Sequence, residues 1–343
     1  MSLQVRSVRL GPVSFRARPR TWLVAALAWG IALAGAIAVL FSGSVNMTPE
    51  QFWAALVGVG ERADMLLLWE FRMPRAVTGL VVGACLGTAG CLFQALSRNA
   101  LGSPEIIGLT GGAALGAVAS VIVFRSFGWG TAVGAIIGCL GAALLTWVLS
   151  PRGFGGGNRL ILIGLGVASL IQPVTVLLLT RADSDSATSA RLWLTGTLNA
   201  RNWSHAAVGA VLFAVILPFA LLISRHLDAA APGEDLAAGL GVSRRFTQWT
   251  ATGIGVALTA AAVAVAGPIS FIALAGPHVT RRLLKGPTAP AGVAAGTGAA
   301  LLVAADLVGA NLPGGLQLPV GVTAGLLGGA YLLLLLNGQE RKK

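Results

Sequence analysis

Charged residues are absent from long stretches of this chain, and that absence limits its possible folds more than any motif does. The segment 76–96 contains no Asp, Glu, Lys or Arg. About 20 residues at roughly 1.5 Å rise each span the bilayer's hydrocarbon core of about 30 Å, so this segment predicts a membrane-crossing helix. Because Gly79, Gly83, Gly87 and Gly90 recur at three- and four-residue spacing, neighbouring helices can approach it closely, and we expect other helices to surround it.

Composition extends this prediction to the whole chain. Charged residues make up 10% of the sequence and hydrophobic residues 55%, whereas a soluble domain has roughly 25% charged residues. The chain is therefore predicted to be an integral membrane protein in contact with lipid. Its net charge of +12 does not indicate nucleic acid, because the basic residues are divided among short loops between apolar runs, as the positive-inside rule expects.

Ten apolar segments predict an all-α protein with about ten transmembrane helices in a single membrane domain, 21–336. A basic arm, 1–20, precedes this domain, and a basic tail, 337–343, follows it. No cleavable signal peptide is evident, because the first apolar run is long enough to remain as an anchor. The predicted spans are 21–41, 76–96, 106–124, 131–149, 160–180, 205–224, 250–267, 268–278, 289–308 and 319–336.

The span 268–278 is too short to cross a bilayer in the ordinary way, so loop charge decides whether it crosses. With ten crossings, 17 of the 24 Lys and Arg residues share the side of both termini and 7 lie opposite; without this crossing the division is 11 against 13. The positive-inside rule favours ten crossings, with both termini cytoplasmic. Other helices must then enclose the short segment, where the irregular backbone at Pro268 and Pro277 can be satisfied.

No pattern in the sequence indicates catalysis, so the chain is predicted not to be an enzyme and to bind no cofactor or metal itself. The turn 151–159, PRGFGGGNR, lacks the Lys and Ser/Thr of a phosphate-binding loop. The three histidines have no metal-ligand spacing, and the three cysteines form no C-x-x-C pair. Asp306 is the only acid within the predicted spans. Glu105 lies just outside one, at the cytoplasmic end of the span 106–124. A carrier driven by an ion gradient usually keeps more ionisable groups in the membrane, so it remains only an alternative.

Three motifs in order carry a resemblance to a known family. They are R-x-P-R at 72–75, G-A-x-L-G-x-A-G-x-x-x-Q at 83–94, and R-N-x-L-x-x-P-x-x-x-G at 98–108. This pattern resembles the FecCD family, the permease subunits of ABC importers for ferric siderophores, haem and cobalamin. The resemblance implies the fold of a type II ABC importer permease in the bacterial inner membrane.

The same resemblance implies partners and cargo. The expected partners are a second permease subunit, identical or homologous, a pair of ABC ATPase subunits that hold ATP and Mg, and an extracytoplasmic substrate-binding protein. Ferric siderophore is the expected cargo, with cobalamin and haem as open alternatives.

Family positions can be carried over where the motifs match. Arg72 and Arg75 match arginines that pair with carboxylates of the binding protein, the alternative being ordinary interfacial charges. Asn99 and Leu101 match part of a cytoplasmic gate, although Ala100 replaces the usual proline. The remaining matches imply structural or gating roles and are Gln94, Pro104, Trp193, Gly196, Pro277 and His278. An interfacial aromatic anchor is an equal alternative for Trp193, and a structural role at a helix end is favoured over a proton carrier for His278.

The segment 225–249 is predicted to contact the ATPase. Glu234 and Asp235 would begin a short helix there, where the positive end of the helix dipole favours acids. The A-x-x-L-G-V pattern that follows resembles the coupling helix of these permeases. The alternative is an ordinary amphipathic loop helix. The residues that match the coupling helix are Ala237, Leu240, Gly241 and Val242.

Two positions depart from the family pattern. Ala310 stands where the family has arginine and Gln317 where it has glutamate. Because both charges are missing together, we expect fewer charged contacts on that side, as in one member of an asymmetric permease pair.

Overall fold

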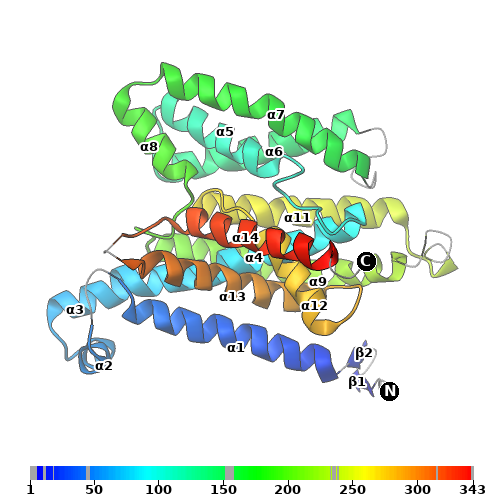
Figure 1. Ribbon diagram of the computed structural model, residues 1–343, viewed down its shortest axis with the longest axis horizontal. Coiled ribbons are helices and arrows are strands. Elements are labelled where there is room, and N and C mark those ends of the chain that lie inside the picture. Colours follow the sequence, from blue (N-terminus) through cyan, green and yellow to red (C-terminus); the bar gives the residue numbers. More distant parts are fainter. Residues whose placement is uncertain are drawn as a thin grey trace.

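The computed structural model describes residues 6–10, 13–17, 19–43, 47–150, 158–231, 233, 237, 239–313 and 316–340. It is a helical bundle with a two-stranded hairpin before the first helix (Figure 1). Its elements are β1 (Arg6–Leu10), β2 (Val13–Ala17), α1 (Pro19–Phe41), α2 (Pro49–Val57), α3 (Arg62–Leu66), η1 (Leu67–Arg72), α4 (Met73–Ser97), α5 (Leu109–Ile122), α6 (Trp129–Leu149), α7 (Asn158–Arg181), α8 (Ser184–Leu194), α9 (Trp203–Ala230), α11 (Arg244–Ala266), α12 (Ile272–Leu284), α13 (Ala291–Ala310) and α14 (Val320–Glu340).

The helical fold predicted from the apolar segments is confirmed. Each of the ten predicted spans overlaps one helix, although the shortest, 268–278, begins four residues before α12 and ends six residues before α12 does. Among the described residues seven helices are long and apolar enough to cross a membrane. The other three spans overlap α5, α12 and α14. The two ends of the bundle are referred to below as the termini end, where α1 begins and α14 ends, and the α2 end, where α2 and α3 lie (Figure 1).

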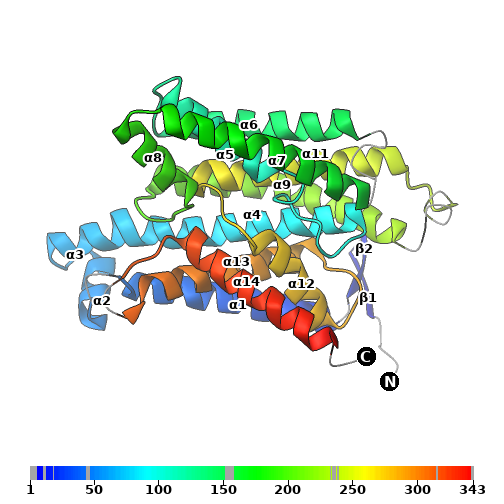
Figure 2. The same ribbon diagram turned by 45° about the horizontal axis from the view of Figure 1, so that its top comes forward.

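Helix α4 is the centre of the bundle. It runs between α9 and α11 on one side and α13 and α1 on the other (Figure 2). A Cβ atom added at Gly83 would lie 2.6 Å from the Gly298 carbonyl oxygen of α13, and one at Gly87 or Gly90 would overlap a backbone carbonyl of α13 or α12. The predicted close packing on the glycine face is therefore confirmed, and substitution there would force neighbouring backbones apart.

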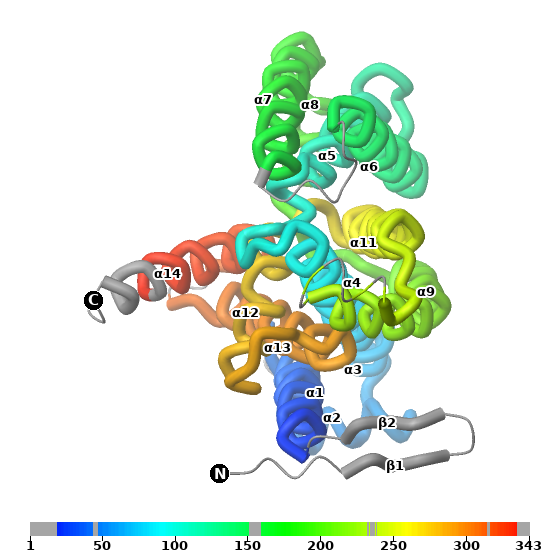
Figure 3. The backbone as a smooth tube through the Cα atoms, turned by 90° about the vertical axis from the view of Figure 1, so that its right-hand side faces the viewer, coloured from blue at the N-terminus to red at the C-terminus, as the bar shows by residue number. Residues whose placement is uncertain are grey.

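Helices α5 to α8 form a second group beside this core (Figure 3). Glycines make the α5–α6 contact as close as the contacts of α4, because a Cβ at Gly116 of α5 would overlap the Gly134 carbonyl of α6. This group contacts the core through α11, which packs against α6 and α5.

The sequence Thr48-Pro49-Glu50-Gln51 is a capping-box pattern that predicts a short helix over 49–57, and α2 has these bounds. Its capping box is complete: the Gln51 N–H donates to Thr48 Oγ1 at 3.2 Å, and the Thr48 N–H donates to Gln51 Oε1 at 2.9 Å. Each hydrogen bond satisfies a backbone donor at the helix start.

Two elements were not predicted. The basic arm contains the antiparallel hairpin β1–β2, with Arg6 opposite Ala17, and its sequence alternates apolar and polar residues, the period of a strand. The connection after α7 contains α8, which begins at the N-cap Asp183 with the Ser186 N–H donating to the carboxylate at 3.3 Å. A polar cap therefore starts a helix where hydropathy alone indicated a loop.

Candidate functional site

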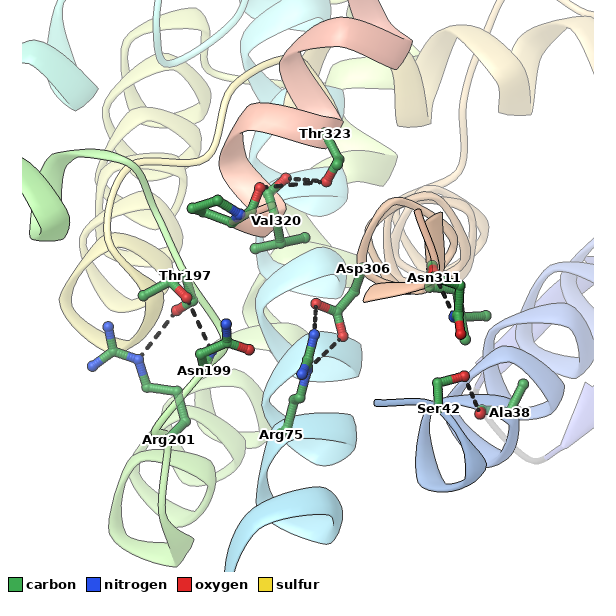
Figure 4. Close-up of polar contacts among 12 residues, drawn as sticks. Ala38, Ser42, Arg75, Thr197, Asn199, Arg201, Asp306, Asn311, Val320 and Thr323 are labelled. Carbon is green, nitrogen blue, oxygen red and sulfur yellow. Dashed lines mark hydrogen bonds and ion pairs between the residues drawn. The ribbon is translucent and has the colours of Figure 1, made fainter. Parts of the chain in front are cut away.

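An ion pair joins α4 and α13 at the α2 end of the bundle. Arg75 of α4 donates from Nε to Asp306 Oδ2 at 2.9 Å and from Nη2 to Oδ1 at 2.8 Å (Figure 4). Asp306 of α13 is only 3% exposed. This bidentate geometry is the strong form of an arginine–carboxylate contact, so the pair fixes α4 against α13 at this end.

Arg72 lies on the same end of the bundle but contacts a different helix. Its side chain is 5% exposed, and Nη1 donates to the Leu40 carbonyl in the last turn of α1. Docking of another protein through Arg72 or Arg75 would require the side chain to leave its partner within the chain. The docking role of these two arginines therefore stays a prediction.

Sequence reasoning missed the Arg75–Asp306 pair. Asp306 was recognised as the only acid within the predicted spans, and no partner was assigned to it. The signal was available, since opposite charges lie near the same end of two predicted spans. The asymmetric-pair interpretation of Ala310 and Gln317 stays a prediction.

Three glycines meet where connections from distant parts of the chain cross. The Thr197 N–H donates to the Ala266 carbonyl at 2.8 Å, and the Gly321 N–H donates to the Gly196 carbonyl at 3.0 Å. Gly196 has a left-handed φ of 65°, and a Cβ there would overlap the Pro268 carbonyl oxygen. This glycine junction (Gly196, Gly267 and Gly321) thus connects the α8–α9 loop, the α11–α12 loop and the start of α14. Gly196, predicted for a structural or gating role, lies at its centre.

Trp193 is the second residue predicted near this junction. Its side chain is half-buried and packs against the main hydrophobic core. Its backbone carbonyl faces Gly267, where a Cβ would approach it to 2.8 Å. The residue therefore packs against the core as part of the junction, and its role in gating or as an interfacial anchor stays a prediction.

Helix α12 has the enclosed, irregular backbone that the sequence predicts. Because Pro277 has no N–H, the Ala273 carbonyl loses its partner within the helix, and this carbonyl instead faces Gly90 of α4. One turn further, Gln94 Nε2 donates to the Leu274 carbonyl at 3.1 Å. His278 lies edge-on to Tyr331, with ring centroids 5.8 Å apart. Gln94 thus joins α4 to α12, and His278 contacts α14 from α12.

Glu105 caps the start of α12 from the turn after α4. Its Oε1 accepts the Phe271 N–H at 2.8 Å, and Phe271 is the N-cap residue with a left-handed φ of 68°. Burial raises the pKa of Glu105 to about 7, while the hydrogen bond from Phe271 acts in the opposite direction. The carboxyl group therefore keeps its proton in the folded protein at a pH where the unfolded chain has lost it.

Replacing Glu105 with glutamine is expected to reduce the pH dependence of stability. The folded-state pKa is raised from about 4.5 to about 7, so the folded state holds more protons in this window and wild-type stability falls as pH rises through it. Glutamine keeps an oxygen that can accept from Phe271 and does not titrate. Thermal unfolding in detergent at pH 5 and pH 8 should show a smaller decrease for Glu105→Gln than for wild type. The control is Glu50→Gln, at an exposed residue of α2. An equal decrease in stability between pH 5 and pH 8 in wild type, Glu105→Gln and Glu50→Gln would contradict the prediction.

The predicted gate turn follows α4 at the termini end. Arg98 ends the helix with a left-handed φ of 49°, and Asn99 Oδ1 accepts the Leu101 N–H at 2.9 Å. Leu101 is exposed, whereas Pro104 is buried and its carbonyl accepts the Leu109 N–H at 3.0 Å. The turn therefore presents one apolar side chain outward from a hydrogen-bonded frame. Its gating role stays a prediction.

The predicted coupling residues lie at the same end. Ala237 is buried and its carbonyl accepts the Val242 N–H at 2.9 Å, while Leu240 is 70% exposed and Gly241 has a left-handed φ of 75°. Glu234 and Asp235 lie outside the described residues. An exposed leucine on a tight turn could enter a cleft of a partner, so the coupling role stays a prediction.

The part of the chain that the structure describes contains no group of three His, Cys, Asp or Glu side chains placed to hold a metal ion. The three cysteines, Cys85, Cys91 and Cys139, are buried and unpaired with one another.

Comparison with known proteins gives consistent matches along the chain. The model of the FecCD transport family matches residues 31–337. The ferric enterobactin transport system permease protein FepG of Escherichia coli is 40% identical over 306 residues, 89% of this chain and 92% of that protein. The probable siderophore transport system permease protein YfhA of Bacillus subtilis is 33% identical, over 93% of this chain and 96% of that protein. A solved inward-facing structure reported as a metal-chelate type ABC transporter superposes with a TM-score of 0.81 at 25% identity, covering 92% of this chain and 99% of that one.

Proposed function

Because this chain belongs to the FecCD transport family, we propose that it is the membrane permease of an ABC importer that carries ferric siderophores. The observation that carries the proposal is the 40% identity with a ferric enterobactin permease over 89% of the chain. A second relative at 33% identity is also described as a siderophore permease. Ferric siderophore is therefore favoured over cobalamin and haem.

The orientation follows from charge. The termini end faces the cytoplasm in this proposal, because that arrangement puts 17 of the 24 basic residues inside. The gate turn with Asn99 and the coupling residues around Leu240 then face the cytoplasm together. The α2 end, with the Arg75–Asp306 pair, faces the outside of a bacterial inner membrane.

The proposed mechanism is alternating access. Two permease subunits, identical or homologous, enclose a pathway, and ATPase subunits bind to the segment 225–249. Binding and hydrolysis of ATP, with its Mg, occur on those partners. Their closure moves the coupling residues and switches the side on which the pathway is open, while an extracytoplasmic binding protein delivers cargo to the α2 end.

The test is uptake of three radiolabelled cargo classes, namely a panel of ferric siderophores that includes ferric enterobactin, haem and cobalamin, by cells with the gene deleted and then restored. We expect deletion to abolish uptake of one or more ferric siderophores and restoration to recover it. Loss of cobalamin or haem uptake alone would keep the importer assignment and overturn the cargo. Unchanged uptake of all three would contradict the proposed function.

Energy coupling separates the importer from the alternative of a gradient-driven carrier. Uptake by an ABC importer should stop when the partner ATPase carries an inactive catalytic site, and it should persist briefly under an uncoupler while cellular ATP lasts. A carrier driven by a proton gradient would show the opposite pair of results.

A further inference from the structure

The first turn of α12 receives its cap from a distant part of the chain. Because Ile272 and Ala273 are buried, the N–H groups at this helix start need partners within the protein. The N-cap residue Phe271 makes no side-chain capping bond. Its own N–H donates to Glu105 Oε1 at 2.8 Å, across 166 positions of sequence. The start of α12 therefore depends on where the α4–α5 connection (98–108) places this carboxyl group.

The α4–α5 connection is itself held by the second helix group. Thr146 Oγ1 of α6 donates to the Ile107 carbonyl at 3.2 Å. A Cβ at Gly164 of α7 would lie 2.5 Å from the Ile106 carbonyl oxygen and from Ile107 Cα, so the connection and α7 are in backbone contact. Figure 3 shows the connection, in cyan, between the second helix group and α14. Movement of α6 or α7 therefore moves Glu105.

Phe271 extends this chain of contacts to α14. A Cβ at Gly328 of α14 would overlap the Phe271 side chain, so glycine is needed for α14 to pack this closely. Phe271 also has a left-handed φ of 68°, a conformation that a residue with a side chain keeps only where its surroundings hold it. Glu105 thus joins the second helix group to the point where α12 and α14 meet.

A local cap would have been enough for stability alone. Ser270 precedes Phe271, and serine is a preferred capping residue. Helix α11 has such a cap, since Ser243 Oγ accepts the Phe246 N–H at 3.4 Å. A helix capped from its own connection keeps its first turn when other parts of the protein move. Helix α12 keeps its cap only while the α4–α5 connection holds Glu105 within hydrogen-bond distance.

We propose that Glu105 is a positioning residue for transport, which makes the gate turn, the start of α12 and α14 move together. Asn99 and Leu101 of the gate turn lie in the same connection as Glu105. If the gate turn moved without α12, Phe271 would lose its hydrogen-bond partner at a helix start that is enclosed by protein, and this loss opposes separate movement. The role in transport rests on the proposed function, whereas the dependence of α12 on Glu105 does not.

Hydrogen exchange of the importer in nanodiscs tests this dependence. Glu105→Ala should speed the exchange of the amides 271–275 by about tenfold, because the first turn of α12 loses its cap. Glu105→Gln keeps an acceptor oxygen and should stay within about threefold of wild type. The matched control is Asp183→Ala, which removes the acid that caps α8 from its own connection. It should speed exchange in α8 and leave the amides 271–275 within about twofold of wild type.

A double-variant cycle tests whether the position of the α4–α5 connection acts through Glu105. Gly164→Ala displaces the connection, because the added Cβ overlaps its backbone. This substitution should speed the exchange of the amides 271–275 when Glu105 is present and add less than about twofold in the Glu105→Ala background. If Gly164→Ala does not fold, Thr146→Val gives a milder displacement by removing the hydrogen bond to Ile107. Independent effects of the two substitutions, or unchanged exchange in Glu105→Ala, would overturn the proposal.

Uptake of ferric enterobactin into liposomes, measured together with ATP hydrolysis, tests the role in transport. Glu105→Ala should lower the uptake per ATP hydrolysed by at least about tenfold, and Glu105→Gln should restore this ratio to within about threefold of wild type. A folding defect alone would lower uptake and hydrolysis in equal proportion and leave the ratio unchanged. An unchanged ratio in Glu105→Ala would therefore contradict the role in transport. If the wild type takes up no ferric enterobactin, the proposed cargo is wrong, and the exchange experiments decide the proposal.

Discussion

Replacing Gly196 with alanine is expected to prevent stable folding of this permease. An alanine at the left-handed φ of 65° costs about 1–2 kcal/mol by itself. Its Cβ would also overlap the Pro268 carbonyl oxygen, which belongs to backbone and cannot rotate away. The junction would have to open, and the hydrogen bonds from Thr197 to Ala266 and from Gly321 to Gly196 would be strained or lost. The total should exceed about 4 kcal/mol.

The measurement is the yield of monodisperse protein after detergent extraction, followed by its thermal unfolding. Gly141→Ala in α6 is the matched control, because a Cβ there meets no atom within 4 Å. Alanine in a helix interior is favoured over glycine by up to about 1 kcal/mol, so this variant should be as stable as wild type or more stable. Normal yield and stability of Gly196→Ala would show that the junction is less rigid than its geometry implies.

Replacing Asp306 with asparagine is expected to produce the second large loss. The change leaves the Arg75 guanidinium next to a neutral group at a site where the acid is 3% exposed. Removing one partner from a buried ion pair typically costs about 3–5 kcal/mol, because the other charge stays buried. Arg75→Gln should be comparably destabilising, and the double variant should lose less stability than the two single losses combined.

The double variant also separates the structural role of Arg75 from the predicted docking role. If Arg75 only holds α4 against α13, the folded double variant should bind the substrate-binding protein as wild type does. If Arg75 also docks that protein, binding should remain weak although the fold is restored. Arg62→Gln is the control for loss of one positive charge at this end of the bundle. Because Arg62 of α3 is exposed, this variant should be as stable as wild type. Strict additivity of the two single losses would show that the pair does not contribute as a unit.

Local pattern in the sequence was enough to predict most of the helices. Apolar length places all ten spans, the capping box places α2, and the glycine spacing of α4 predicts its burial. The enclosure of the short α12 could also be predicted, because a segment of that length at membrane depth needs protein around Pro277. Each of these depends on residues close to one another in the chain.

The features that the sequence did not reveal depend on residues far apart in the chain. Gly196, Gly267 and Gly321 meet through three separate connections, and Arg75 and Asp306 come from helices that are distant in sequence. Glu105 could be recognised as an acid near a mouth, but its role as the cap of α12 depends on how the turn after α4 folds back. Helix α8 was missed for a different reason, because its polar sequence lacks the hydropathy by which the other helices were found.

The packing of α4 has a consequence for how this chain can change over generations. The buried glycines and alanines of α4 (Met73–Ser97) allow other helix backbones to pack closely against it. Replacing one of them with a larger residue therefore adds atoms where there is no space. Helix α6, by contrast, leaves residues such as Ile137 and Leu144 largely exposed, and many apolar side chains would serve there equally well. Natural selection should therefore accept many substitutions in the outer helices and remove most substitutions in α4. The helix with the least distinctive side chains is then the one whose sequence is the least free to vary.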